Sequence, residues 1–416
     1  MKTLITNISK ILHVDNQGNP YKRGVDMGHF PVTEKGWLMI ENDRIADYGG
    51  EDKEPGRFHD VIDAQGGMVL PTWVDSHTHL VFAATREDEF AMRLRGMSYA
   101  EIANAGGGIL NSARALREMP EEELYQAAAE RLRELIKMGT GAIEVKSGYG
   151  LTPESELKML RVASRLEKDF NIPLRSTFLG AHAIPEKYQQ HREAYLRQLT
   201  DVAMPEIARQ GLANYVDVFC EEGYFTLSEM RELLRYGKRY GLKPKVHVNQ
   251  FTSQGGIKEA ISHQAVSVDH LEVMAEGETA LLGNSSTIAT LLPGCSLFLE
   301  IPYAPARKLI KDNAIVALAS DYNPGSAPSG NMNLAVSLAC IKMKMTPEEA
   351  ITAATLNGAA ALEMSDELGS IERGKLANIM ITQPMRSYSL IPYQFGHNLI
   401  KQVFIKGEAQ YVEASK

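Results

Sequence analysis

The segment GGMVLPTWVDSHTH, residues 66–79, decides the fold, because a short apolar strand in it runs directly into two histidines. His77 and His79 stand two positions apart, and alternate side chains of a strand point to the same face. Two imidazoles on one face are a natural pair of metal ligands, and in a barrel they would lie at the carboxyl ends of the strands, where active sites form. The alternative is a chance pair of exposed histidines.

The middle of the chain alternates short apolar strands with helix-period segments. About eight such units over roughly 300 residues match the size of a (β/α)8 barrel. The competing fold is an open doubly wound sheet, which usually has a glycine-rich phosphate loop after its first strand. Here the glycines 106–108 come much later and lack that spacing. We therefore predict an α/β protein with a (β/α)8 TIM barrel over residues 67–369.

The individual elements of the barrel follow from the same pattern. The strands are expected within residues 66–79, 140–150, 172–182, 215–223, 243–250, 265–272, 285–301 and 313–323. The seventh of these joins SSTIATLLP to its apolar continuation CSLFLEI. The clearest helices are expected at residues 120–138, 152–170, 226–241 and 346–362, several of which open on Thr or Pro-Glu-Glu start signals.

Both ends of the chain are expected to form β-structure. GWLMIENDRIADYGG (36–50) is typical of two strands around a turn, and LITNISKILHV (4–14) of further strand-length pieces. Near the other end, LANIMITQP (376–384) and NLIKQVFIKGEAQYV (398–412) are strand-like, with a turn at residues 406–408. Residues 1–66 and 370–416 are therefore predicted to form one small domain together.

The charge and the cysteine content of the chain indicate which partners and which cellular location to expect. The 416 residues carry a net charge of −8 without a Lys/Arg-rich run, so neither nucleic acid nor a membrane is expected as a partner. Cys220, Cys295 and Cys340 form no C-x-x-C pair and are expected to be reduced thiols. Neither a signal-peptide core nor a membrane-length apolar run is present, so a cytoplasmic location is expected.

Other predicted strands also end in residues that bind metals. His182 ends the third strand, and the fifth, sixth and eighth carry His247, His270 and Asp321. Burying such groups costs free energy, so packing alone does not explain them. Three imidazoles and one carboxylate around a divalent cation would lower the pKa of a bound water to about 7. Nitrogen-rich ligands suit Zn²⁺, and also Fe²⁺ or Mn²⁺.

This pattern resembles the amidohydrolase superfamily, and more specifically the imidazolonepropionase family. The superfamily likeness also includes TAATLNGAAAL (352–362) and LGSIERGKLANIMI (368–381). The likeness to the imidazolonepropionase family extends from about residue 70 to about residue 330 and rests on several longer motifs. They are VDSHTHLVFAATREDEF (74–90), GGGI (106–109), EVKSGYGL (144–151), FLGAHAIP (178–185), VDVFCEEG (216–223) and SDYNPGS (320–326).

The resemblance implies a (β/α)8 barrel with a small β-sandwich built from both termini. It implies hydrolysis of the ring amide of 4-imidazolone-5-propanoate, a small molecule, to N-formimidoyl-L-glutamate in histidine degradation. Family members are often dimers, so a homodimer is expected. The implied metal ligands are His77, His79, His247 and Asp321. The implied substrate contacts are Arg86, Tyr149, His182, Asn323, Gly325 and Ser326. Gln250 is a further expected contact, although some imidazolonepropionases have Glu at this position.

The residue chemistry agrees with these roles. The planar guanidinium of Arg86 matches a propionate carboxylate, although a surface salt bridge is the alternative. Many related deaminases have Glu where this chain has Gln250, and a glutamine cannot act as a general acid. Acid–base work therefore falls to Asp321 and His270. Lys146 lies on the second strand, whereas two-metal relatives carry their bridging lysine on the fourth, so one metal is predicted.

Two other functions remain open from the sequence. The first is an aminohydrolase of a purine, pyrimidine or related ring, against which Gln250 and Arg86 count. Release of ammonia would identify it. The second is a non-catalytic scaffold of the same fold. Such proteins usually lose metal ligands, and this chain keeps the whole set.

Overall fold

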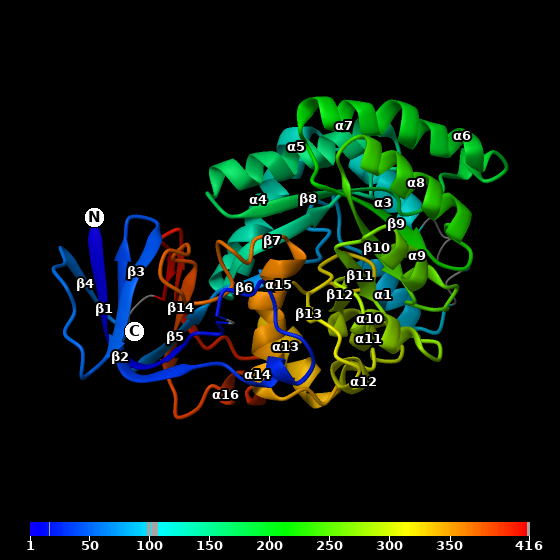
Figure 1. Cartoon of the computed structure of the whole chain (residues 1–416). Helices are drawn as coiled ribbons and strands as arrows, with labels where there is room; N and C mark the ends of the chain where they lie inside the picture. The colour runs from blue at the N-terminus through cyan, green and yellow to red at the C-terminus, as the bar shows by residue number, and fades with distance from the viewer. Residues whose placement is uncertain (16, 98–100, 102–106, 414–416) are drawn as a thin grey trace.

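The computed structural model of the chain describes residues 1–15, 17–97, 101 and 107–413. Gly106, which opens the GGGI segment, lies outside these residues. The molecule consists of a barrel with a second sheet at one side, and both ends of the chain lie at this second sheet (Figure 1). No helix within the described ranges is long and apolar enough to span a bilayer.

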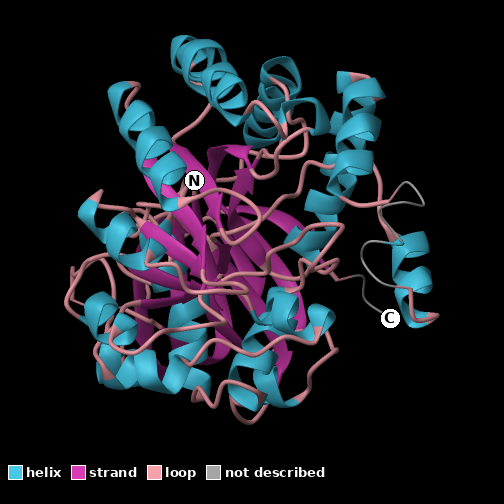
Figure 2. Cartoon of the chain, turned by 90° about the vertical axis from the view of Figure 1, so that its right-hand side faces the viewer, coloured by secondary structure: helices cyan, strands magenta, loops and turns pink. Residues whose placement is uncertain are grey.

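Eight parallel strands in chain order form the barrel sheet, and helices surround the central strands in Figure 2. The predicted barrel is confirmed, and each expected strand region contributes one strand. The strands are almost entirely buried, which explains why they appear in the sequence as short apolar runs. They are β6 (Trp73–Asp75), β7 (Thr140–Lys146), β8 (Leu174–Ala181), β9 (Tyr215–Cys220), β10 (Lys243–Val248), β11 (Ser267–His270), β12 (Ile288–Leu291) and β13 (Val316–Leu318).

The first and last strands meet just beyond their ends. The backbone N–H of His79 donates to the carbonyl of Tyr322 at 2.9 Å, and that of Asp321 donates to the carbonyl of His77 at 3.0 Å. A parallel bridge between Thr78 and Tyr322 lies at the same place. The seam of the barrel is therefore closed by the segments that carry the predicted metal ligands.

The helices expected at residues 120–138, 152–170 and 226–241 are present, whereas the one expected at 346–362 is divided into two helices at Thr355. Thr226 and Thr346 begin α8 and α14 with reciprocal hydrogen bonds to a glutamate three residues on, which satisfies the free N–H groups of the first turn. The helices are α1 (Glu87–Leu94), α3 (Ile109–Glu118), α4 (Glu121–Lys137), α5 (Pro153–Asp169), α6 (Arg192–Arg197), α7 (Met204–Gln210), α8 (Leu227–Arg239), α9 (Gly256–Ser262), α10 (Glu278–Gly283), α11 (Pro293–Leu299), α12 (Ala306–Lys311), α13 (Met332–Ile341), α14 (Pro347–Ala354), α15 (Leu356–Ala361) and α16 (Leu390–Tyr393). Two 3-10 helices, η1 (Gly24–Gly28) and η2 (Glu186–Tyr188), and one π-helical segment, η3 (Gln198–Ala203), are also present.

One predicted strand segment was wrong. CSLFLEI was expected to continue the seventh strand, but Cys295–Leu299 lies in helix α11. Pro293 occupies the first turn of this helix, where a missing N–H costs nothing. A short apolar run does not distinguish a strand from a helix by periodicity, and the proline was the signal that the strand had ended.

The second sheet takes strands from both ends of the chain, as expected. Their order is β16-β15-β14-β5-β1-β2-β3, with β4 also paired to β1. The edge of β1 opposite β2 is shared between β4 and β5, so the sheet divides into two branches. The strands are β1 (Lys2–Leu12), β2 (Val32–Glu41), β3 (Arg44–Gly50), β4 (Asp60–Asp63), β5 (Gly67–Pro71), β14 (Ile379–Pro384), β15 (Ile400–Ile405) and β16 (Glu408–Val412).

This sheet has a hydrophobic core of its own. Its buried side chains include Ile5, Leu38, Val69, Ile379 and Phe404, which come from five strands. Strand β5 pairs with β14 and β1, whereas β6 pairs with β7 of the barrel. Strand pairing therefore places β5 in the second sheet and β6 in the barrel. The two strands read as one apolar run in the sequence, interrupted only at Pro71 and Thr72.

Candidate metal centre and active site

Five side chains meet at the carboxyl ends of the barrel strands. His77 and His79 follow β6, His247 lies on β10, His270 ends β11 and Asp321 follows β13. All five are at most 2% exposed. Ligand atoms lie within 4.8 Å of one another in the group His77–His79–His247 and again in the group His77–His270–Asp321. The structure therefore brings the four predicted ligands and His270 into one cluster.

Distances within the cluster are short enough for a shared cation. Oδ1 of Asp321 lies 3.4 Å from Nε2 of His77 and 3.6 Å from Nε2 of His79. The ring centroids of His77 and His247 are 4.5 Å apart. His270 and Asp321 have φ of 88° and 58°, a left-handed backbone that non-glycine residues rarely adopt and that clusters at functional sites.

The histidines are neutral and fixed in orientation, which is what a metal site requires. Nδ1 of His77 donates to Oδ2 of Asp269 at 2.7 Å, and Nδ1 of His247 donates to Oδ2 of Asp217 at 2.9 Å. In the described structure the Nε2 atoms of both rings are buried without a hydrogen-bond partner, as is Nδ1 of His79. Burial lowers the pKa of all three histidines well below the usual value. These free lone pairs fit a divalent cation.

The carboxylates that hold the histidines belong to a buried ionic network inside the barrel. The ammonium of Lys146 donates to Glu144 at 2.7 Å and to Asp217 at 2.8 Å, and lies 3.5 Å from Asp269. Lys245 donates to Glu144 and to the carbonyl of Ser76. Burial opposes the charge of Lys146, but Asp217, Glu144 and Asp269 raise its pKa overall. Lys146 is therefore an ion-paired ammonium that neutralises the network.

Sequence reasoning missed most of this network. Asp217, Asp269, Glu144 and Lys245 were not singled out. Their signal was present as charged residues at alternate positions of apolar strands, such as Lys245 two residues before His247. Alternate residues share a face, so these charges point into the barrel with the ligands.

Asp321 and His270 have shifted acidities. Burial raises the pKa of Asp321 to about 6, although His270 beside it acts in the opposite direction. Burial alone would lower the pKa of His270, but the nearby carboxylate of Glu272 raises it to about 8. A cation bound against Asp321 would lower the pKa of that carboxyl again. The two groups thus lie close together, with the pKa of each raised above its usual value.

Arg86, Tyr149 and His182 lie beside the cluster. The guanidinium of Arg86 is 5.9 Å from the ring centre of Tyr149, and its Nε donates to Oγ of Ser112 at 2.9 Å. The His182 ring stacks on His79 at 5.2 Å, and its Nδ1 donates to the carbonyl of Gly148 at 3.0 Å. Burial lowers the pKa of His182 to about 4. His182 is therefore a neutral ring facing the same space.

The remaining predicted contacts lie in two loops. Nε2 of Gln250 donates to Sγ of Cys295 at 3.2 Å. Asn323 accepts from the N–H groups of Gly325 and Ser326 at 2.7 and 2.8 Å and donates to the carbonyl of Asp321. Its side chain is therefore engaged in shaping the loop. Oγ of Ser326 lies 3.3 Å from Oδ2 of Asp321.

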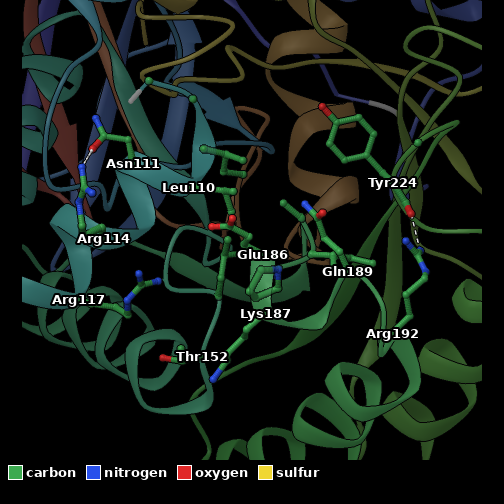
Figure 3. A pocket seen from close by; sticks show the side chains of 18 residues that line it. Leu110, Asn111, Arg114, Arg117, Thr152, Glu186, Lys187, Gln189, Arg192 and Tyr224 are labelled. Carbon is green, nitrogen blue, oxygen red and sulfur yellow. Dashed lines mark hydrogen bonds between the residues drawn. The ribbon is translucent and has the colours of Figure 1, made fainter. Parts of the chain in front are cut away.

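A cavity of about 970 Å³ lies outside the buried cluster, between α3 and the loops that follow β7, β8 and β9 (Figure 3). Four basic side chains and one acidic side chain line it, namely Arg114, Arg117, Lys187, Arg192 and Glu186. The guanidinium of Arg192 already donates hydrogen bonds to Glu229 and to the carbonyl of Tyr224. The excess of positive charge favours the approach of an anion.

The chain was compared with known protein families and proteins. The model of the amidohydrolase family matches residues 68–409. An imidazolonepropionase of Christiangramia forsetii is 53% identical over 98% of this chain and 100% of that protein, and one of Clostridium tetani is 40% identical over 98% of both.

Among solved structures, an adenosine deaminase from Xanthomonas campestris with bound zinc has a TM-score of 0.70 and 16% identity, covering 99% of this chain and 93% of that one. The guanine deaminase of E. coli has a TM-score of 0.72 and 16% identity, with full coverage of both chains. At this level of identity these two structures support the fold alone.

Proposed function

Because the chain belongs to the amidohydrolase family, and within it to the imidazolonepropionases, we propose that it hydrolyses the ring C–N amide bond of 4-imidazolone-5-propanoate. The product is N-formimidoyl-L-glutamate. The observation that carries the proposal is the cluster of three neutral, buried imidazoles and Asp321. Arg86 lies close by, as a substrate with a propionate tail requires.

His77, His79, His247 and Asp321 would hold one divalent cation, which we propose to be zinc or iron, with manganese also compatible. When bound, such a cation polarises a carbonyl and makes a water molecule acidic enough to be a nucleophile near neutral pH. Asp217 and Asp269 keep Nε2 of His247 and His77 free for this purpose. Asp321 adds the negative charge.

Asp321 and His270 carry the acid–base steps. The free carboxylate oxygen of Asp321 takes the proton from the attacking water and later delivers it to the leaving ring nitrogen. His270 donates a hydrogen bond to the oxyanion that forms at the ring carbonyl. Gln250 lacks an ionisable proton, so it serves as a hydrogen-bonding group toward the ring.

The other proposed contacts orient the substrate. Arg86 binds the propionate, and its hydrogen bond to Ser112 fixes the plane of the guanidinium. Tyr149 and His182 line the ring side of the site, and Gly325 and Ser326 lie in the loop after Asp321. Asn323 orders that loop through its bonds to both residues. This anchoring places the scissile bond against the cluster.

The deciding experiment is an assay of metal-loaded protein with freshly generated 4-imidazolone-5-propanoate. Formation of N-formimidoyl-L-glutamate without ammonia, abolished by a chelator and restored by metal, is expected. Release of ammonia instead would identify an aminohydrolase. Metal-loaded protein without any turnover would contradict this substrate. Gel filtration tests the proposed homodimer, and cell fractionation tests the proposed cytoplasmic location.

A further inference from the structure

A second group of potential ligands lies next to the proposed metal centre. It consists of His270 at the end of β11, Glu272 in the loop that follows, and Cys295 in helix α11. One ligand atom from each of the three residues lies within 4.8 Å of the others. The three residues are 2%, 5% and 0% exposed. A buried imidazole, carboxylate and thiol are thus gathered in one place.

The carboxylate of Glu272 is only half satisfied. Its Oε1 lies 3.4 Å from Nδ1 of His270, and Oγ of Ser296 donates to the same oxygen at 3.4 Å. Its Oε2 is buried and has no hydrogen-bond partner within the ranges that the structure describes. Leaving a buried carboxylate oxygen unpaired is costly, and a ligand that pairs with it recovers this free energy.

The chemistry of the three side chains selects a particular class of ligand. A thiolate, an imidazole and a carboxylate are the ligands of a tetrahedral zinc site, and thiolate favours soft divalent ions over magnesium or calcium. Around one zinc ion, ligand atoms lie roughly 3.3–3.8 Å apart. The 3.4 Å between Nδ1 of His270 and Oε1 of Glu272 already meets this spacing.

We propose that His270, Glu272 and Cys295 form a second cation site, which takes a thiophilic divalent ion such as Zn²⁺ or Cd²⁺. Binding forms a metal–sulfur bond, and the thiol proton of Cys295 leaves to solvent. This site is separate from the four ligands assigned above. The existence of this second site does not depend on the proposed function. One consequence does rest on that function: a cation in the second site occupies His270, so excess zinc inhibits turnover.

The test uses the fact that the proposed main site contains no sulfur. Protein loaded with one equivalent of zinc is titrated with Cd²⁺, and the thiolate-to-metal charge-transfer absorption in the ultraviolet is followed. In the wild type, we expect the absorption band to be complete after about one equivalent of Cd²⁺. No band is expected in Cys295→Ser. The band should be unchanged in the matched control Cys340→Ser, whose thiol lies in α13. Glu272→Gln should weaken Cd²⁺ binding at least tenfold.

Absence of the band in the wild type, or its persistence in Cys295→Ser, would overturn the proposal. Retention of the first zinc equivalent by each variant shows that it has folded. The outcome is independent of the activity assay. Turnover is measured on the one-zinc protein before Cd²⁺ is added, because a cation in the second site is expected to inhibit it. No turnover at that stage, followed by a sulfur band on titration, would refute the proposed function and leave the second site standing, whereas turnover without a later band would do the reverse.

Discussion

Nδ1 of His247 donates to Oδ2 of Asp217 at 2.9 Å, and this hydrogen bond determines which nitrogen of the ring faces the cluster. Asp217 also accepts from Lys146 and, through its other oxygen, from the backbone N–H of His247. One buried carboxylate thus links a proposed metal ligand to the ionic network of the barrel. The consequences for metal binding, stability and turnover are separately measurable.

Replacement of Asp217 by Asn should reduce metal affinity by roughly 10–100-fold, because the partner of a ligand histidine fixes its ring and tautomer. Competition with a chromogenic chelator measures the affinity. Asp366→Asn, at an exposed position, is the matched control. An Asp217→Asn protein that binds metal as tightly as the wild type would show that this hydrogen bond does not orient His247.

Lys146→Met should destabilise the fold by about 3–5 kcal/mol, because it leaves Asp217, Glu144 and Asp269 buried with an excess negative charge. Equilibrium unfolding in urea gives the change in the free energy of unfolding. The exposed Lys168→Met serves as the comparison and should change it little. Equal stability of the two variants would contradict the neutralising role of Lys146.

Asp321→Asn should lower kcat by roughly 10²–10⁴-fold, since an amide accepts no proton from water at neutral pH. Metal content and kcat are measured on the same preparation. The prediction concerns the variant that still retains its metal. If that protein turned over at close to the wild-type rate, another group would have to be the base.

Arg86→Ala should raise KM for the imidazolone by roughly 10–100-fold with a much smaller effect on kcat, because a charge-assisted contact to the propionate is lost. Arg93→Ala in the same helix region controls for loss of a positive charge. Steady-state kinetics over a wide substrate range separates the two constants. An unchanged KM would rule out the proposed contact with the tail.

Gly325→Ala should raise KM for the imidazolone, as Arg86→Ala does, but by a smaller factor. A Cβ atom added at Gly325 would lie 2.8 Å from Nη1 of Arg86, so the guanidinium must move. A severalfold increase in KM is expected, with metal content unaffected. Gly28→Ala, where the nearest atom is 3.8 Å away, is the control substitution. Wild-type kinetics in Gly325→Ala would mean that the position of Arg86 is not critical.

The fold could be predicted from the sequence because buried parallel strands are short apolar runs, and because several of them end in His or Asp. Hydrophobic periodicity did not give the right element where a short apolar run can form either a strand or a helix. Cys295–Leu299 is as apolar as a strand, yet Pro293 begins a helix there. Strand β5 likewise merges with β6 in the sequence and separates from it only through its partners.

The candidate ligands could be predicted for the same reason, but their supporting residues could not. Asp217 and Asp269 stand out only as charged residues within apolar strands, which does not show what they contact. Only the folded chain shows that Asp269 meets His77, which is 192 residues away. Pairing across a barrel depends on strand order, and one sequence does not reveal which buried charges face each other.

The proposed cation would also stabilise the seam between the first and last barrel strands. The backbone N–H of Asp321 donates to the carbonyl of His77 across this seam, and both residues contribute to the cluster. If these two residues hold the proposed cation, it connects the first and last strands of the barrel. Cation binding and seam closure are then thermodynamically linked, so the ion stabilises the closed cylinder as well as preparing the site for reaction. Amide exchange at the seam should accordingly slow when metal is added.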